Sequence, residues 1–212
     1  MISSSVAPAS RARAICVPTA FWCKEDPVHF HMFLRVARLF DAVFTTDEGM
    51  VPLYRRYLGH DRVFPLAFAT QPRIHNPFAS RERERNVCFA GTFYRNRYRA
   101  RGEELVKMFA AAGDALVIYD RNSKLGREHY RFPDAFSPYV RPALPYAEIE
   151  KAYKGYCAGI NCNSVTHSST MFSRRVYELL SCGTPVLSNP SRGMQEQFDM
   201  VIVRDTEEGY RQ

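Results

Sequence analysis

The sequence predicts an α/β fold built on a parallel sheet, and three observations support this prediction. Short apolar runs rich in β-branched residues alternate with longer amphipathic stretches, which is the pattern of successive βαβ units. The composition, with 46% hydrophobic and 24% charged residues, is that of an ordinary globular protein. The length of 212 residues is enough for a sizeable core but not for two large lobes.

The apolar runs are the expected strands, and the amphipathic stretches are the expected helices. Strands are predicted over residues 14–17, 42–45, 63–66, 87–90, 115–119, 158–162, 185–187 and 201–203. Helices are predicted over residues 29–40, 103–112 and 171–181, where apolar residues recur at helical spacing. Two further helix starts are expected, one at Asp47 and Glu48 and one at Thr206 and Glu207.

Residues 72–85 break the alternation with prolines and a charged run, which is typical of a linker. We therefore expect a disordered tail over residues 1–14 and a partial N-terminal Rossmann-like domain over residues 15–71. A second domain is expected over residues 86–212. Neither domain looks complete, because the first has about three strands and the second stops where a helix begins.

The formal net charge of +7 suits a negatively charged partner, such as a nucleic acid, an acidic membrane or a phosphorylated small molecule. Glutamates alternate with several of the clustered arginines, so an ordinary solvated face is an equal alternative. No RNP, helix-turn-helix or zinc signature is present, and we expect no nucleic-acid partner.

The six cysteines are scattered without a CxxC pair, so we expect reduced thiols, no metal site and no cofactor. No apolar stretch is long enough to span a bilayer, and the first fourteen residues lack the apolar segment of a signal peptide. Cytoplasmic residence is the expectation.

The most informative segment is SSTMFSRRVYELLSCGTPVL, residues 168–187. It predicts a helix capped by Ser168 or Ser169 and ended by Gly183, followed by a buried strand. The free N–H groups of such a helix would face a pyrophosphate near Thr170, Met171 and Phe172. Arg174 and Arg175 add positive charge there, and Glu178 lies where its carboxylate would accept hydrogen bonds from a ribose. The alternative is a plain amphipathic core helix.

The run YELLSCGTPVL resembles the nucleotide-binding helix and turn of GT-B glycosyltransferases of the family-four type. Further runs, FWCKEDPVHF, FDAVFTTDEGMVPLY, VCFAGTFY and VIYDRN, are similar to the CgeB-type spore maturation group of glycosyltransferases. The resemblance covers about residues 15–205. It implies a GT-B-like α/β fold and an enzyme that moves a sugar from a nucleoside diphosphate donor to an acceptor.

By this resemblance Glu178 matches the glutamate that holds the donor ribose. Thr170 stands where many relatives have the first glutamate of an E-x7-E pair, so the sugar contact of that carboxylate is absent or replaced. The identity of the donor and the stereochemical outcome are therefore left open.

Other loops are expected beside the donor. Gly91 and Thr92 follow a strand, and the resemblance places this turn at the donor phosphates, with Arg95 or Arg97 as partners. An ordinary βα loop is the alternative. Three more donor candidates end neighbouring strands: Tyr119, Asp120 and Asn163.

The loop after the first predicted strand contains the catalytic candidates Glu25, Asp26 and His29, a cluster of titratable groups that suits acid–base chemistry. The resemblance puts this loop on the acceptor side. An equal alternative is that Asp26 or Glu25 caps the helix that follows Pro27.

The sequence thus favours a glycosyltransferase that uses a nucleotide sugar and an unknown acceptor. The alternative is a non-catalytic or truncated GT-B-like binding or structural protein, associated with spores or the envelope. That alternative follows from the short chain, because a GT-B catalyst needs two full Rossmann-like lobes.

Overall fold

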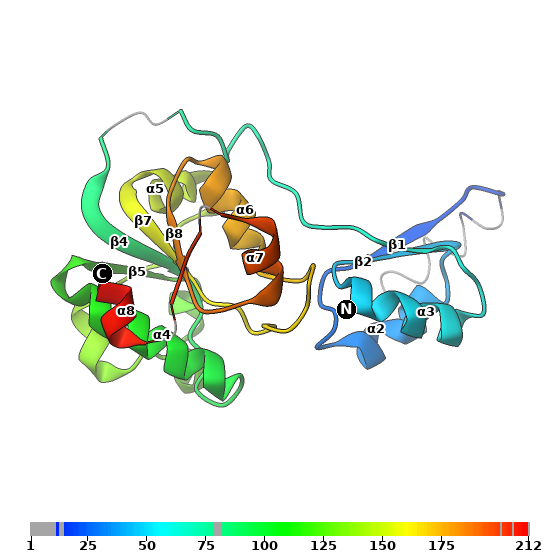
Figure 1. The fold of residues 1–212 in the computed structure, drawn as a ribbon, viewed down its shortest axis with the longest axis horizontal. Coiled ribbons are helices and arrows are strands. Elements are labelled where there is room, and N and C mark those ends of the chain that lie inside the picture. Colours follow the sequence, from blue (N-terminus) through cyan, green and yellow to red (C-terminus); the bar gives the residue numbers. More distant parts are fainter. Residues whose placement is uncertain (1–11, 13–14, 79–81, 200, 205, 212) are drawn as a thin grey trace. The chain divides into compact units, whose positions relative to one another are not determined.

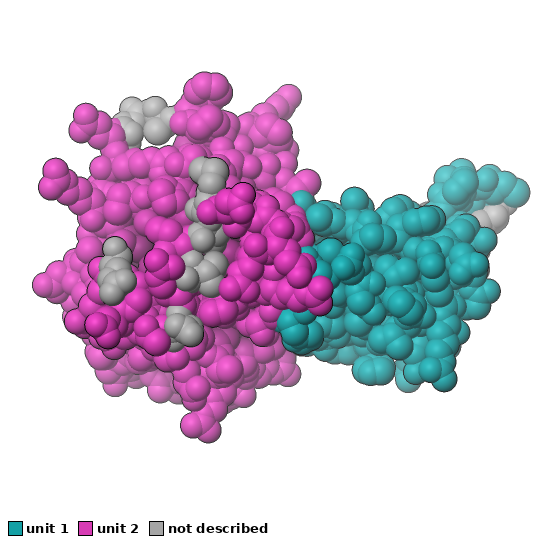
Figure 2. Space-filling model, viewed as in Figure 1, with its two compact units in different colours: residues 1–68, 167–171 teal, residues 69–166, 172–212 magenta. Residues whose placement is uncertain are grey.

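The computed structural model describes residues 12, 15–78, 82–199, 201–204 and 206–211. The predicted disordered tail over residues 1–14 lies almost entirely outside these ranges. The chain divides into two compact units, which Figure 2 shows in different colours. Unit 1 comprises residues 1–68 and 167–171, and unit 2 comprises residues 69–166 and 172–212.

The described residues of unit 1 form a small parallel sheet with two helices. Its strands follow the order β1-β2-β3, and their bounds are Ala20–Cys23 for β1, Ala42–Thr45 for β2 and Val63–Pro65 for β3. Helix α2 spans Phe30–Ala37, and α3 spans Val51–Leu58 after the short 3₁₀ turn Glu48–Met50. The Asp47 side chain accepts a hydrogen bond from the Gly49 N–H and so caps that turn, which confirms the expected helix start.

The predicted strand over residues 14–17 is wrong for its described part. Strand β1 begins later, at Ala20, where the chain pairs in register with Ala42 of β2. Ile15 is 72% exposed, so the described residues do not cover it with an apolar layer, and Pro18 lacks the N–H that a ladder needs at this point. The predicted strands over 42–45 and 63–66 are confirmed as β2 and, one residue shorter, β3.

Unit 2 is a six-stranded parallel sheet in the order β6-β5-β4-β7-β8-β9 (Figure 1). The strands are β4 (Glu84–Gly91), β5 (Leu116–Asp120), β6 (Val140–Arg141), β7 (Tyr156–Asn161), β8 (Val186–Ser188) and β9 (Val201–Val203). The helices are α4 (Arg99–Ala112), α5 (Glu150–Lys154), α6 (Arg174–Ser181), α7 (Arg192–Gln197) and α8 (Glu207–Arg211). Five short 3₁₀ turns also belong to this unit: Gly113–Ala115, Ser123–Leu125, Glu128–Tyr130, Asp134–Tyr139 and Tyr146–Glu148.

The strand order reverses direction between β4 and β7, because β4 to β6 run toward one edge and β7 to β9 toward the other. The carboxyl ends of β4 and β7 therefore border a topological switch point, where parallel α/β sheets bind ligands. All the strand pairs of the sheet are parallel, as predicted.

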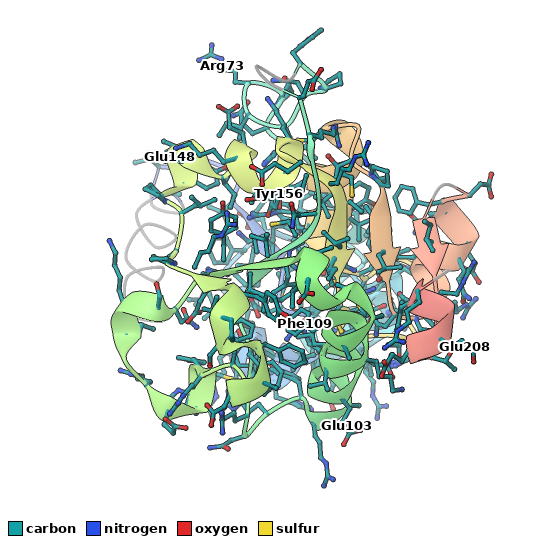
Figure 3. The ribbon with its side chains drawn as sticks, turned by 90° about the vertical axis from the view of Figure 1, so that its left-hand side faces the viewer. Arg73, Glu103, Phe109, Glu148, Tyr156 and Glu208 are labelled. Carbon is teal, nitrogen blue, oxygen red and sulfur yellow. The ribbon has the colours of Figure 1, made fainter. Side chains whose placement is uncertain are left out.

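Side chains of β4 alternate between the two faces of the sheet, and each face has its own core. Phe89 packs with Leu105 and Phe109 of α4. Cys88 and Ala90 pack instead with the buried residues of α5 and α6. Figure 3 shows Phe109 directed into the interior and Glu103 directed outward from the same helix. The helices α4 and α8 thus cover one face, and α5 and α6 cover the other.

The sequence analysis does not predict strand β6, helix α5 or helix α7 of unit 2. Strand β6 has two residues, Val140 and Arg141, and so no apolar run exists for a pattern to detect. The predicted strands of unit 2 are present with ends shifted by three residues at most, and the last helix begins at the expected Glu207. None of the helices that the structure describes has the length and apolar character needed to cross a bilayer.

Candidate functional site

Glu178 is a buried carboxylate on the second turn of α6. Its side chain is 6% exposed, and three side chains from unit 2 surround it. The Arg174 Nε atom lies 2.8 Å from Oε1, and the Tyr153 hydroxyl donates a hydrogen bond of 2.9 Å to Oε2. The His75 Nε2 atom lies 3.9 Å from Oε1. A charged acceptor held this way is suited to binding hydroxyl groups.

His75 is the main site residue that the sequence analysis misses, because it stands in the predicted linker. Its Nδ1 atom accepts a hydrogen bond from the Gln71 N–H, so the proton of the neutral ring is on Nε2, which faces Glu178. Burial lowers the pKa of His75, and Arg174 and Lys154 lower it further, although Glu178 acts in the opposite direction. The buried Nε2 atom of His75 lies near Glu178 but has no hydrogen-bond partner among the described residues.

The predicted linker also makes structural contacts within unit 2. The turn over residues 71–76 carries His75, and the Asn76 side chain accepts a hydrogen bond from the buried Lys154 ammonium. Arg83 donates to the Cys182 carbonyl and the Thr184 hydroxyl, at the C-terminal end of α6. A cation at this end satisfies the free carbonyls of the helix. The two Arg83 bonds thus hold the end of α6, the helix that carries Glu178.

Helix α6 begins later than the sequence predicts. Its N-cap is Ser173, whose hydroxyl accepts from the Arg175 N–H, and not Ser168 or Ser169. Ser168 instead closes a local turn by accepting from the N–H of Met171. Serine favours both positions for the same reason, since its oxygen accepts from a nearby backbone donor. The prediction of a serine N-cap for α6 is therefore confirmed, but the capping residue is Ser173.

Because of this shift, the three residues expected at the helix N-terminus precede it. Thr170 and Met171 belong to unit 1, where the Thr170 hydroxyl donates to the Thr46 carbonyl and accepts from the Glu48 N–H. Phe172 belongs to unit 2 and is buried against Tyr177 and Phe198. None of the three presents a backbone N–H from the first turn of α6.

Gly91, the last residue of β4, lies next to Arg175. A Cβ atom at Gly91 would lie 2.7 Å from the Arg175 Nη2 atom and 2.7 Å from the Phe89 ring, so this position requires glycine. The Arg175 guanidinium packs over the Phe89 ring at 5.1 Å, and its Nε atom is buried without a hydrogen-bond partner among the described residues. An orphaned guanidinium donor at a strand end is suited to an anionic ligand.

Three of the expected donor-binding residues hold neighbouring segments of unit 2 together by hydrogen bonds: Thr92, Arg95 and Asn163. Thr92 is buried, and its hydroxyl accepts from the Asn122 amide. Arg95 donates to the carbonyls of Arg131 and Phe132. Asn163 accepts from the Ser173 N–H and so anchors the start of α6 to the end of β7.

Tyr119 and Asp120 end β5 as expected. The Tyr119 hydroxyl shares a hydrogen bond of 2.8 Å with the Tyr156 hydroxyl, within the unit. Asp120 accepts from the Asn122 N–H, and burial raises the pKa of this carboxyl. Neither side chain contacts the Glu178 group among the described interactions.

The three catalytic candidates of unit 1 differ in how far their side chains are buried. Asp26 is completely buried and accepts hydrogen bonds from the hydroxyls of Thr45 at 2.7 Å and Tyr54 at 3.2 Å. Burial raises its pKa, and it also raises the pKa of neighbouring Cys23 to about 12. Glu25 is exposed and His29 is half-buried.

The alternative role of Asp26 or Glu25 as a helix cap is wrong. Helix α2 has His29 at its N-cap without a side-chain cap hydrogen bond, and the Glu25 carbonyl accepts from the His29 N–H. Asp26 instead joins β1, β2 and α3 through its two hydroxyl partners. Within the described ranges no three His, Cys, Asp or Glu side chains gather as metal ligands would.

Comparison with known proteins agrees with this geometry. The family model described as "Glycosyl transferase-like" matches residues 76–211, more than half of the chain. The spore protein CgeB of Bacillus subtilis (strain 168) is 23% identical over 175 residues, which cover 78% of this chain and 54% of that protein.

Two solved structures share the fold at low sequence identity. HepE from Anabaena, solved in complex with UDP and glucose, gives a TM-score of 0.64 at 13% identity. The match covers 100% of this chain and 64% of the HepE chain. An α,α-trehalose-phosphate synthase (UDP-forming) from Burkholderia vietnamiensis gives a TM-score of 0.54 at 10% identity. This match covers 96% of this chain and 61% of the synthase chain. The chain thus spans about half to two thirds of the length of these relatives.

The architecture is GT-B-like, with parallel sheets flanked by helices, as the sequence predicts. The chain belongs to the glycosyl transferase-like family. The predicted resemblance to CgeB-type glycosyltransferases is confirmed.

Proposed function

We propose that unit 2 binds a nucleoside diphosphate sugar and that the protein transfers the sugar to an acceptor. The observation that carries the proposal is the buried Glu178 carboxylate of α6, to which the Arg174 guanidinium and the Tyr153 hydroxyl are bound. Family membership and the UDP complex of HepE support a nucleotide sugar as the ligand. Glu178 would accept hydrogen bonds from the two hydroxyls of the donor ribose.

The arginines supply the charge for the diphosphate. Arg175, with its buried Nε donor beside Gly91, is the candidate for direct phosphate contact. The Arg174 side chain is 50% exposed and contacts Glu178 Oε1, so it has room to turn toward the diphosphate when a ribose takes its place. Positive charge stabilises the diphosphate as the bond from the sugar C1 atom breaks and a bond to an acceptor oxygen forms. The acceptor and the nucleobase are not assigned.

The test is a calorimetric and thermal-shift panel of UDP, GDP, ADP, CMP and dTDP against the whole chain. One nucleotide is expected to bind selectively and to lose affinity in Glu178→Ala, Glu178→Gln and Arg174→Ala. The matched control is Glu196→Ala, which removes an exposed helical glutamate that pairs with Arg192 in the same i, i+4 geometry. A ligand at a hundredfold excess over its Kd stabilises the native state by about 2.7 kcal/mol, which a thermal shift detects. Equal binding by wild type and Glu178→Ala would contradict the proposal.

A second candidate is a GT-B-like protein that binds the nucleotide without turnover. It is favoured by Thr170, which lacks a carboxylate and whose hydroxyl is engaged inside unit 1. The two candidates differ in one measurable quantity, the release of nucleoside diphosphate from the donor sugar in the presence of acceptor extracts. Nucleotide binding without such release would favour this second candidate. Cytoplasmic residence remains a prediction under both.

A further inference from the structure

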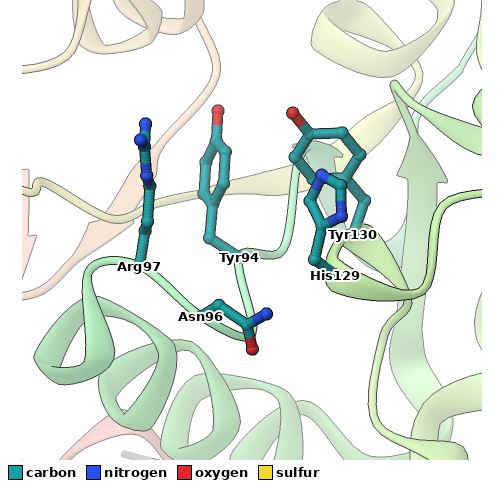
Figure 4. Close-up of a pocket in the computed structure, with 5 residues that line it drawn as sticks. All are labelled: Tyr94, Asn96, Arg97, His129 and Tyr130. Atoms are coloured by element: carbon teal, nitrogen blue, oxygen red, sulfur yellow. The ribbon is translucent and has the colours of Figure 1, made fainter.

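Unit 2 contains a pocket on a different part of the sheet from Glu178. It has a volume of about 320 Å³ and is lined by Tyr94, Asn96, Arg97, His129 and Tyr130 (Figure 4). The loops that form it lead into Phe93 and Phe132, which pack in the core on the α4 face. Tyr153, the partner of Glu178, packs in the core on the opposite face. The pocket is therefore separate from the proposed ribose site.

The walls of the pocket are fixed before any ligand arrives. The Arg95 N–H donates to the His129 carbonyl, and its guanidinium donates to the carbonyls of Arg131 and Phe132. These bonds fasten the turn after β4 to the segment after β5. The guanidinium of buried Arg101 lies 5.7 Å from the Tyr94 ring centre and supports that ring. A preformed cavity of this size is at the lower end of the range for small-molecule sites, about 300–1,000 Å³.

The Tyr94 and Tyr130 rings of the pocket form an edge-to-face pair. Their planes meet at 78°, with their centres 5.7 Å apart. The two rings therefore do not form a parallel-sided slot for a planar base. One ring face is suited to the C–H face of a saccharide chair, whose hydroxyl groups the Asn96 amide could bind.

The polar groups of the pocket favour a negative charge on that ligand. Arg97 is exposed, contributes five N–H donors and lines the pocket together with an amide and an imidazole. No carboxylate is among the described residues that line the pocket. The neighbouring Glu128 carboxylate lies 3.7 Å from Arg95 and 3.8 Å from Arg131, so cations already offset its charge. Figure 4 shows Arg97, Tyr94 and Tyr130 extending toward the same side.

We propose that this pocket is a second ligand site of unit 2 and takes a saccharide ring that bears a carboxylate or a phosphate. The choice of a saccharide rests on the proposed glycosyltransferase function, whereas the negative charge follows from Arg97 and from the lack of a lining carboxylate.

The experiment measures binding of glucuronate, glucose 6-phosphate, glucose, inorganic phosphate and uridine to the whole chain by ligand-observed NMR and calorimetry. Glucuronate, glucose 6-phosphate or both are expected to bind at least tenfold more tightly than glucose or phosphate. Tight binding of glucuronate alone identifies a sugar acid, and tight binding of glucose 6-phosphate alone identifies a sugar phosphate. Arg97→Ala is expected to weaken this binding at least tenfold, and Arg97→Lys is expected to restore part of it.

The matched control is Arg99→Ala, which removes the same charge two residues further along the chain. The Arg99 side chain pairs with Glu103. It is expected to bind the anionic sugar as wild type does. Glu178→Ala is also expected to retain this binding, so that failure of the nucleotide site and failure of the pocket are distinguished. The proposal is overturned if neither anionic sugar exceeds glucose and phosphate, if Arg97→Ala and Arg99→Ala have equal effects, or if uridine binds more tightly than both anionic sugars.

Discussion

Two buried carboxylates, Glu178 in unit 2 and Asp26 in unit 1, have nearly the same exposure but different surroundings. Glu178 has an arginine, a tyrosine hydroxyl and a neutral histidine around it. Asp26 has the hydroxyls of Thr45 and Tyr54 and no cation among its described hydrogen-bond and ion-pair partners, and burial raises its pKa. A buried carboxylate with a movable cation is suited to ligand exchange, whereas one tied only to neutral core donors is suited to holding elements together.

The largest effect is expected from Asp26→Ala, which leaves two buried hydroxyls without their acceptor. We expect unit 1 to lose about 3 kcal/mol of unfolding free energy. The single tryptophan, Trp22, lies in unit 1, so its fluorescence during urea unfolding reports on this unit. Glu178→Ala is the comparison and should leave the tryptophan transition unchanged. A shift of that transition in Glu178→Ala as large as in Asp26→Ala would remove the distinction between the two carboxylates.

Gly91→Ala is expected to have the next largest effect, because its Cβ would collide with the buried Phe89 ring as well as with Arg175. The ring cannot move as easily as the end of an arginine, so unit 2 should lose about 2 kcal/mol. Far-UV circular dichroism during urea unfolding measures this. Gly126→Ala on the surface, where no atom lies near the added Cβ, separates crowding from the strain of a positive φ. Unchanged stability in Gly91→Ala would show that the packing around Arg175 is looser than the structure has it.

Tyr153→Phe is expected to weaken nucleotide binding about fivefold, which corresponds to about 1 kcal/mol, by removing one donor to Glu178. Tyr153 is thus a positioning residue, and the readout is the Kd of the nucleotide and its preference for ribose over deoxyribose. Tyr139→Phe is the matched control, since it removes an exposed hydroxyl bonded to Asp114. An equal Kd in the two variants would assign Tyr153 to packing alone.

The smallest effect is a pH dependence of opposite sign in the two regions. The lowered pKa of His75 means that its contribution to stability is present above its ordinary value of about 6.5 and is lost as the pH falls through the folded value. The raised pKa of Asp26 means that its contribution is present below about 3.8 and is lost as the pH rises through the folded value.

Unfolding measured between about pH 7 and pH 4 tests both signs. His75→Gln should remove acid destabilisation of unit 2, and Asp26→Asn should remove the loss of unit 1 stability at higher pH. Identical pH profiles of wild type and His75→Gln would contradict the neutral state assigned to this imidazole.

Much of the fold was predictable from the sequence because parallel strands in a buried sheet are continuous apolar runs. The strand over 42–45 was predicted correctly for this reason. The helix start at Asp47 was predicted because aspartate is a preferred N-cap residue. The strand over 14–17 was not, because an apolar run indicates a strand only where a partner and a covering layer exist. Strand β6 was missed since it is held by pairing with β5 and not by its own composition.

The candidate site was predictable as far as its local pattern reaches. Glu178, Arg174, Arg175 and Gly91 stand in recognisable segments, and the structure brings them together in pairs within unit 2. The start of α6 was misplaced because two serines offered equivalent caps. His75 and Tyr153 carry no local signal, since their role depends on a long-range approach to α6. An unusual histidine in a proline-rich turn was the one available hint.

The most direct test of the central claim compares a ribonucleoside diphosphate with its 2′,3′-dideoxy form in wild type and in Glu178→Ala. The nucleotide used is the one that stabilises the wild-type chain most. Two hydrogen bonds to a charged acceptor predict at least about a hundredfold preference for the ribose form in wild type. The account predicts that this preference falls to near unity in Glu178→Ala. A preference that is the same in both proteins would show that Glu178 does not bind the ribose.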